Sequence, residues 1–349
     1  MQPMSDGRTD QNESIGAPER SFALSLRAWL SSPTSTALLA LCFILALGFL
    51  FSGEGAFHKW TTHRDALRQA SVYGILACGM TFVIITAGID LSVGSVLALV
   101  AVAFSTLSIH EGWSPWLAVP ACLALGGACG AASGTVVAKW RIQPFIVTLA
   151  MMVFARGLAK TLSSGMKVST AMQLPDGSWT AAPVPDIFRL IDSRLLGDNV
   201  SVVSLIFLGC VGVSWIILSR LRWGRYLYAI GGNEEAARLS GVPVAAMKIM
   251  AYALAGVFAA VAGLCQAAQE QQGDPEAGIG YELTAIAIVV IGGTSLMGGR
   301  GGIGLTLLGT LTIGYLDKIL SVNAVPEASR LMLTAVIIIA AVLLQRRNN

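Results

Sequence analysis

The feature that most constrains this chain is a series of apolar runs, each about as long as a membrane is thick. A helix that crosses the roughly 30 Å hydrocarbon core needs about 20 apolar residues. Most of the runs reach this length, and two near the carboxyl-terminal end are shorter. The runs are Thr34–Gly53, Ala70–Gly88, Asp90–His110, Pro115–Ala138, Pro144–Ser163, Val200–Ser219, Ile249–Gln269, Leu283–Met297, Gly301–Leu320 and Ala328–Leu344.

Composition agrees with a protein that lies in lipid. Apolar residues make up 54% of the 349 and charged residues 12%, whereas a soluble domain carries about 25% charged residues. The net charge of +3 is too small for a protein whose main partner is nucleic acid. The six cysteines lie in apolar runs without a Cys-x-x-Cys pair, so no metal site is indicated. We predict an all-α polytopic membrane protein with about ten transmembrane helices, some short or broken.

Polar segments divide the chain. Residues 1–33 are predicted to form a disordered cytoplasmic tail, followed by a transmembrane domain at 34–345. Within this domain, 164–199 is predicted to be an external loop and 220–248 a cytoplasmic loop. An even number of spans places both termini on one side. That side is predicted to be cytoplasmic because its segments are richer in lysine and arginine, although the basic stretch Lys59–Arg68 falls on the other side.

Two stretches rich in glycine and hydroxyl side chains interrupt the apolar runs. A helix over residues 70–110 would be about 60 Å long, too long for one crossing. The first break is therefore placed near 86–95, where Gly88 can end one helix and Asp90 can cap the next. It is either a tight surface turn or a pair of helix ends inside the protein beside a substrate path. The second break lies at 291–302. The candidate pathway residues of the two breaks are Asp90, Ser92, Ser95, Thr294 and Ser295.

The cytoplasmic loop contains a short segment, 234–240, with strong helix signals. Asn233 is a good N-cap, acidic residues follow it in the first turn, and Gly241 stands where a helix would end. A helix of about 10 Å is not stable alone in water. We expect either a knob that docks on a partner protein or an ordinary solvated loop helix. The residues assigned to the knob are Asn233, Glu234, Glu235, Ala236, Ala237, Arg238 and Gly241.

Two further patterns lie within the apolar runs. Gly126, Gly130 and Gly134 share one helix face and allow another backbone to approach closely, either within the chain or at a subunit contact. Arg156 and Lys160 also share a face. Their charges either reach the headgroups along their aliphatic stems or serve a function inside the membrane.

Several longer motifs occur in a fixed order. They are Gly79-Met-Thr81 with Gly88-Ile-Asp-Leu-Ser-Val-Gly-Ser95, Gln143-Pro-Phe-Ile-Val-Thr-Leu149, Gly224-Arg-Tyr226 with Gly231-Gly-Asn-Glu-Glu-Ala-Ala-Arg-Leu-Ser-Gly241, and Gly280-Tyr-Glu-Leu283 with Gly292-Gly-Thr-Ser-Leu296. In these motifs the chain, from about residue 60 to 345, resembles the permease subunits of ribose-type carbohydrate-uptake ABC transporters. The cytoplasmic knob is similar to the wider importer pattern Glu-Ala-Ala-x3-Gly, without the Leu-Pro that ends it. The resemblance implies that the knob seats in a groove on an ATP-hydrolysing subunit.

No lysine follows a glycine anywhere in the chain, so the Gly-Lys-Ser/Thr end of a P-loop is absent. We therefore expect no catalytic residue, metal or cofactor in this chain, with ATP and magnesium on a partner ATPase. The resemblance also implies an extracytoplasmic sugar-binding protein, for which loop 164–199 is a candidate docking site. A single coupling knob further implies a second permease chain, identical or paralogous.

The predicted function is that of the transmembrane permease subunit of an ATP-driven importer in the bacterial inner membrane. It would move a sugar (a pentose, a hexose or a related polyol) from a soluble binding protein into the cytoplasm. The alternative is an ion-coupled secondary transporter of a small polar solute, in which Asp90 would be the main ion site. An intramembrane enzyme is disfavoured because the chain lacks a plausible nucleophile and base pair.

Overall fold

The computed structural model describes residues 32–173, 177–326, 328–330, 332–333, 335–336 and 339. It confirms an all-α membrane protein. Within these residues, eight helices are long and apolar enough to cross a bilayer. They are α2 (Pro33–Leu50), α3 (Trp60–Ile85), α4 (Val93–Ser105) continued by the π-helix η2 (Thr106–His110), α5 (Pro115–Trp140), α6 (Pro144–Leu162), α8 (Val202–Ser219), α11 (Val244–Glu270) and α13 (Ile303–Val322).

The remaining elements are short and lie mainly at the two ends of the bundle. They are the 3-10 helix η1 (Ala56–His58), β1 (Ala171–Gln173), β2 (Trp179–Ala181), α7 (Asp186–Asp192), β3 (Arg194–Leu195), β4 (Val200–Ser201), α9 (Arg222–Gly232), α10 (Glu234–Leu239) and α12 (Tyr281–Ile291). The strands form two antiparallel pairs, β1 with β2 and β3 with β4. The predicted span 283–297 is thus the shorter helix α12. The predicted span 328–344 and the tail 1–33 lie largely outside the described residues.

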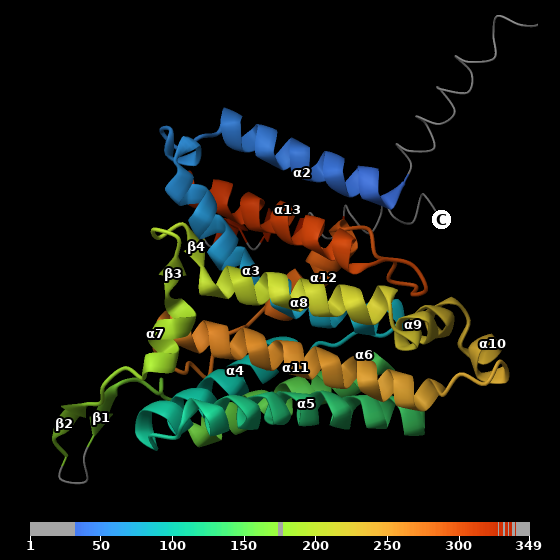
Figure 1. Cartoon of the computed structure of the whole chain (residues 1–349), viewed down its shortest axis with the longest axis horizontal. Helices are drawn as coiled ribbons and strands as arrows, with labels where there is room; N and C mark the ends of the chain where they lie inside the picture. The colour runs from blue at the N-terminus through green and yellow to red at the C-terminus, as the bar shows by residue number, and fades with distance from the viewer. Residues whose placement is uncertain are drawn as a thin grey trace, which may run out of the picture.

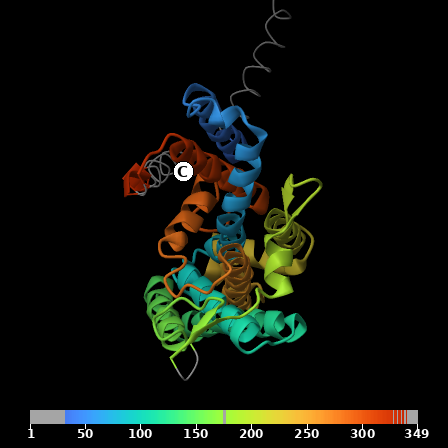
Figure 2. The ribbon, with the colours of Figure 1, turned by 90° about the vertical axis from the view of Figure 1, so that its left-hand side faces the viewer.

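The long helices lie side by side along the longest axis of the molecule (Figure 1). The strands, α7 and η1 gather at one end, which we name the hairpin end. Helices α9 and α10 lie at the other, which we name the α10 end. Seen from the hairpin end, α11 runs through the middle of the bundle (Figure 2), where it packs against α3, α4 and α5. Most of α3 and α4 is buried, whereas α2, α6 and α8 leave most of their apolar surface exposed, as helices that face lipid do.

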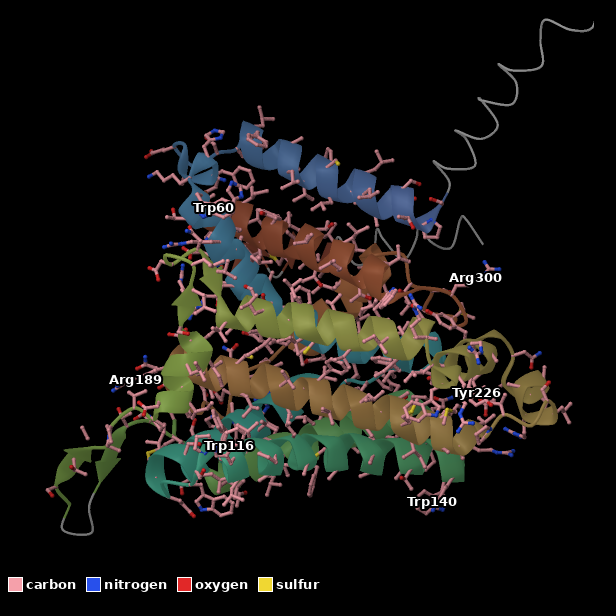
Figure 3. All side chains as sticks on the ribbon, in the orientation of Figure 1. Trp60, Trp116, Trp140, Arg189, Tyr226 and Arg300 are labelled. Atoms are coloured by element: carbon pink, nitrogen blue, oxygen red, sulfur yellow. The ribbon has the colours of Figure 1, made fainter. Side chains whose placement is uncertain are left out.

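Large aromatic side chains mark two levels along this bundle. Trp60 and Trp116 are exposed near the hairpin end, and Trp140 is exposed toward the α10 end (Figure 3). Tryptophan is enriched at both membrane–water interfaces, because its ring is apolar and its N–H needs a partner. The two levels agree with a membrane whose plane lies across the long helices.

The glycine stripe on α5 serves internal packing. A Cβ added to Gly130 would lie 2.0 Å from the carbonyl oxygen of Tyr252, and one added to Gly126 would lie 2.4 Å from that of Gly256, both on α11. A Cβ added to Gly134 would lie 2.9 Å from the Cα of Ile249, also on α11. Backbone-to-backbone approach of this kind supplies dispersion contacts that lipid cannot replace. The stripe therefore joins two helices of one chain.

Helix α3 begins at Trp60, ten residues before the predicted span. Charged residues of its first turns are paired within the protein: Arg68 forms an ion pair with Asp192, and Asp65 forms one with Arg194 at 2.8 Å. The carboxylates of Asp65 and Asp192 offset part of the positive charge of Lys59–Arg68, the basic stretch that the predicted topology places on the outer side. The sequence underestimated this helix because its charged turns are stabilised by a loop far away in the chain.

Candidate functional site

The short helix predicted in the cytoplasmic loop is present as α10, and its caps are confirmed. The side-chain oxygen Oδ1 of Asn233 accepts a hydrogen bond from the backbone N–H of Ala236 at 2.9 Å. At the other end, Gly241 has a φ of +82° and donates to the carbonyl of Arg238, while Val242 donates to that of Ala237. This is the Schellman arrangement, in which glycine takes the left-handed position after the last helical turn. Local sequence therefore specifies both ends of α10.

One face of α10 is held to the bundle and the other is free. Glu234 forms ion pairs with Lys248 of α11 at 2.6 Å and with Arg238 at 3.1 Å, and Ala237 is buried. Burial acts to raise the pKa of Glu234, but the hydrogen bonds and charges of Lys248 and Arg238 lower it below its ordinary value. On the free face, the Leu239 side chain is 82% exposed. A single exposed leucine is common on protein surfaces, so the docking role of α10 stays a prediction.

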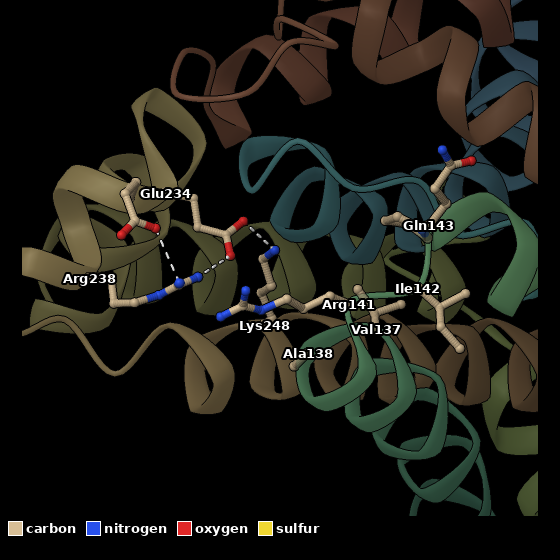
Figure 4. A pocket seen from close by; sticks show the side chains of 10 residues that line it. Val137, Ala138, Arg141, Ile142, Gln143, Glu234, Arg238 and Lys248 are labelled. Atoms are coloured by element: carbon tan, nitrogen blue, oxygen red, sulfur yellow. Dashed lines mark hydrogen bonds and ion pairs between the residues drawn. The ribbon is translucent and has the colours of Figure 1, made fainter.

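A cavity of about 430 Å³ lies between α10 and the turn that joins α5 to α6 (Figure 4). Its lining includes both glutamates of α10, Arg238 and Lys248 on one side, and Arg141 and Gln143 on the other. Figure 4 shows Arg141 extending toward Lys248 and α10, whereas Ile142 points the opposite way.

The last turn of α9, which leads into α10, touches both helix breaks. A Cβ added to Gly231 would lie 1.8 Å from the carbonyl oxygen of Ile85 and 2.4 Å from the backbone nitrogen of Gly299. Those two atoms also form a hydrogen bond with each other, at 2.9 Å. Ile85 ends α3 and Gly299 lies in the second break, so one glycine brings three segments into backbone contact.

The first break, residues 86–92, is mostly buried and exposed at Ala87, so a polar turn at the surface does not describe it. Asp90 is 1% exposed, and its Oδ1 accepts hydrogen bonds from the backbone N–H of Ser92 at 2.8 Å and from the Ser92 hydroxyl at 2.6 Å. Ser92, rather than Asp90, is the N-cap of α4, and Ser95 is buried on its first turn. Ala87, not Gly88, takes the left-handed conformation, with a φ of +59°.

The second break, residues 292–302, folds on itself. Thr294 and Ser295 are buried, and the Ser295 N–H donates to the carbonyl of Arg300 at 3.0 Å. Gly301 fits against Thr294, whose side-chain atoms would lie 2.4 Å from an added Cβ. All five predicted pathway residues are buried; Ser95 lies on the first turn of α4, and the other four lie in the two breaks. These meet through the backbone at Ile85 and Gly299.

A third irregular segment, 271–280, was not predicted. Its backbone runs beside α4: Gly273 contacts Ala101, and Gly278 contacts Gly94 at the start of that helix. Arg156 on α6 donates from Nη1 to the carbonyl oxygens of Pro275 at 2.6 Å and Ala277 at 2.7 Å. Arg156 therefore holds irregular backbone inside the bundle, which replaces the reading of a side chain that reaches the headgroups. The clustered glycines and Pro275 were the signal available in the sequence.

Comparison with known proteins identifies the architecture. The family model described as branched-chain amino acid transport system / permease component matches residues 64–341. The chain belongs to this family. Its membership agrees with a multi-pass inner-membrane permease that does no chemistry of its own, and it gives no support to an ion-coupled transporter.

Three curated permeases are similar over nearly their whole length. The ribose import permease protein RbsC of Escherichia coli K12 is 42% identical over 326 residues, which cover 92% of this chain and 96% of that protein. The fructose import permease protein FrcC of Rhizobium meliloti is 34% identical over 340 residues, 97% and 92%. The L-arabinose transport system permease protein AraH of Escherichia coli K12 is 34% identical over 331 residues, 95% and 94%. No solved structure matches the chain.

Proposed function

We propose that this chain is the transmembrane permease subunit of an ATP-driven importer that moves a sugar from a soluble binding protein into the cytoplasm. One observation carries the proposal: the capped, partly exposed helix α10 follows α9, whose Gly231 contacts the end of α3 beside the first break and Gly299 in the second break. Similarity to ribose, fructose and L-arabinose permeases supports a sugar as the substrate class.

The proposed mechanism is a population shift. A partner ATPase binds ATP with magnesium and seats on α10, and it binds ATP more tightly in one state of the complex. A ligand shifts a conformational equilibrium only by its differential affinity for the two states. Movement of α10 and α9 then displaces Ile85 and Gly299 together, and the breaks around Asp90 and Thr294 change from one opening to the other. The permease itself binds the sugar weakly, because tight binding would slow release of the sugar into the cytoplasm.

The two ends have different partners in this proposal. The α10 end faces the cytoplasm and the ATPase, with both chain termini on the same side. The hairpin end faces outward, and loop 164–199 receives the sugar-loaded binding protein. A second permease chain completes the pore, since α10 alone supplies one docking site for a machine that uses two ATPase subunits.

Proteoliposomes test the proposal directly. We expect ribose, or a related sugar, to accumulate only when the chain is reconstituted with its ATPase, its binding protein and ATP. Dissipating the ion gradients at constant ATP should leave uptake unchanged. Uphill uptake by this chain alone, or loss of uptake on gradient collapse, would overturn the proposal in favour of an ion-coupled transporter.

A further inference from the structure

Given the proposed docking of an ATPase on α10, we propose that the cavity beside α10 receives an acidic side chain of that ATPase, which pairs with Arg141. The cavity is about 430 Å³ and lies between α10 and the α5–α6 turn. A carboxylate and a guanidinium form two parallel hydrogen bonds, which gives such a contact both strength and direction.

The side chains that line the cavity include more cations than carboxylates. Three cations line it, and two of them are already committed: Lys248 pairs with Glu234, and Arg238 pairs with Glu234 and Glu235. Arg141 forms no hydrogen bond or ion pair with any residue that the structure describes. The cavity therefore holds one cation more than it holds carboxylates, and the surplus charge is on Arg141.

The backbone at Arg141 supports a role for its side chain. Arg141 ends α5 in the left-handed conformation, with φ of +54°, a position that helices usually fill with glycine. An arginine here adopts a conformation that L residues avoid. It extends toward α10, while its neighbour Ile142 points away (Figure 4).

The surrounding surface favours an acidic protein. Among the described residues of the α10 end, the exposed cations without an ion pair are Lys139, Arg141, Arg220, Arg222, Arg225 and Arg300, whereas both carboxylates of α10 are paired. A lipid phosphate would approach from the membrane side, yet Arg141 turns toward α10 and away from Ile142. The geometry therefore favours the ATPase that covers α10 over a headgroup as the occupant.

Charge reversal at Arg141 tests the contact in the complete transporter, assembled in phosphatidylcholine nanodiscs. We expect R141E to weaken ATPase association roughly tenfold or more, whereas K139E, a charge reversal outside the cavity, weakens it much less because it removes only a long-range attraction. An Asp→Lys or Glu→Lys change in the ATPase should restore association with R141E and weaken it with wild type. Wild-type association by R141E, or a defect that appears only when phosphatidylglycerol is added, would overturn the proposal, the latter in favour of a lipid.

A second variant keeps the test informative if R141E does not fold. In R141K, a carbodiimide should couple the introduced amine to a carboxylate of the ATPase, giving a cross-linked peptide that wild type does not give. Absence of that peptide in a correctly assembled complex would contradict the contact. Substitutions on α10 could abolish ATPase stimulation while R141E leaves association unchanged and R141K gives no cross-link. In that case the acidic contact at Arg141 is wrong and the proposed function stands.

Discussion

At the hairpin end, most basic side chains are paired with carboxylates, whereas at the α10 end most of them are not. Arg68 pairs with Asp192 across two segments, and Lys167 pairs with Asp274 at 2.9 Å. The irregular segment 271–280 is likewise held by Arg156. At the α10 end the breaks meet through glycine backbone instead, at Gly231 and Gly299. In the proposed function, the hairpin end is the fixed frame and the α10 end is the part that moves and binds the ATPase.

The largest expected effect comes from filling the glycine contact. In G231A the added Cβ would overlap the backbone at Ile85 and Gly299, and overpacking of this kind costs about 1–3 kcal/mol. We expect sugar-stimulated ATP hydrolysis to fall about tenfold, which equals about 1.4 kcal/mol. G232A is the matched control, because a Cβ there meets nothing within 4 Å. Equal activity of the two variants would contradict the role of Gly231.

A smaller effect is expected at the hairpin end. R68A removes a partly buried ion pair between α3 and α7 and should lower the free energy of unfolding by about 1 kcal/mol. The melting temperature should fall, while sugar stimulation per assembled complex stays at the wild-type level. R189A is the control, since its pair with Asp186 is long, 4.0 Å, and exposed. Loss of sugar stimulation in correctly folded R68A would contradict the claim that the hairpin end takes no part in coupling.

The smallest effect is a pH dependence at α10. The pKa of Glu234 is lowered in the folded protein, so its stabilising contribution is complete above its ordinary value, about 4.5, and is lost as the pH falls through the lowered value. The protection of the α10 amides against hydrogen exchange, measured relative to the intrinsic exchange rate at each pH, should therefore fall below about pH 4.5. In E234Q the same amides should exchange faster at neutral pH and respond less to acid. An identical acid response in both forms would exclude Glu234 as the cause.

Features set by neighbouring residues were predictable from the sequence. Asn233 and Gly241 specify the ends of α10 within a few residues, and the apolar runs specify most spans by length alone. Their roles in coupling and in a pathway stay predictions. Features set by distant partners were not predictable: α3 extends to Trp60 because Asp192 and Arg194 pair with its first turns.

Dependence on distant partners also explains why the irregular segment 271–280 and the junction at Gly231 were not predicted. The path of 271–280 depends on Arg156, far away in the sequence, and on backbone contact with α4. The junction at Gly231 depends on Ile85 and Gly299, which no local pattern places together. The sequence therefore indicated where the backbone breaks near 86–95 and 291–302, but not that these breaks meet beneath α9.

The most direct test of the central claim, that energy enters through α10, is sugar-stimulated ATP hydrolysis by the assembled transporter carrying E235R and G241R together. Glu235 lies on α10 and Gly241 follows its C-cap, and both lie outside the candidate membrane spans. The account predicts normal membrane insertion and no stimulation of ATP hydrolysis by the sugar-loaded binding protein. Stimulation equal to that of the wild-type transporter would contradict it.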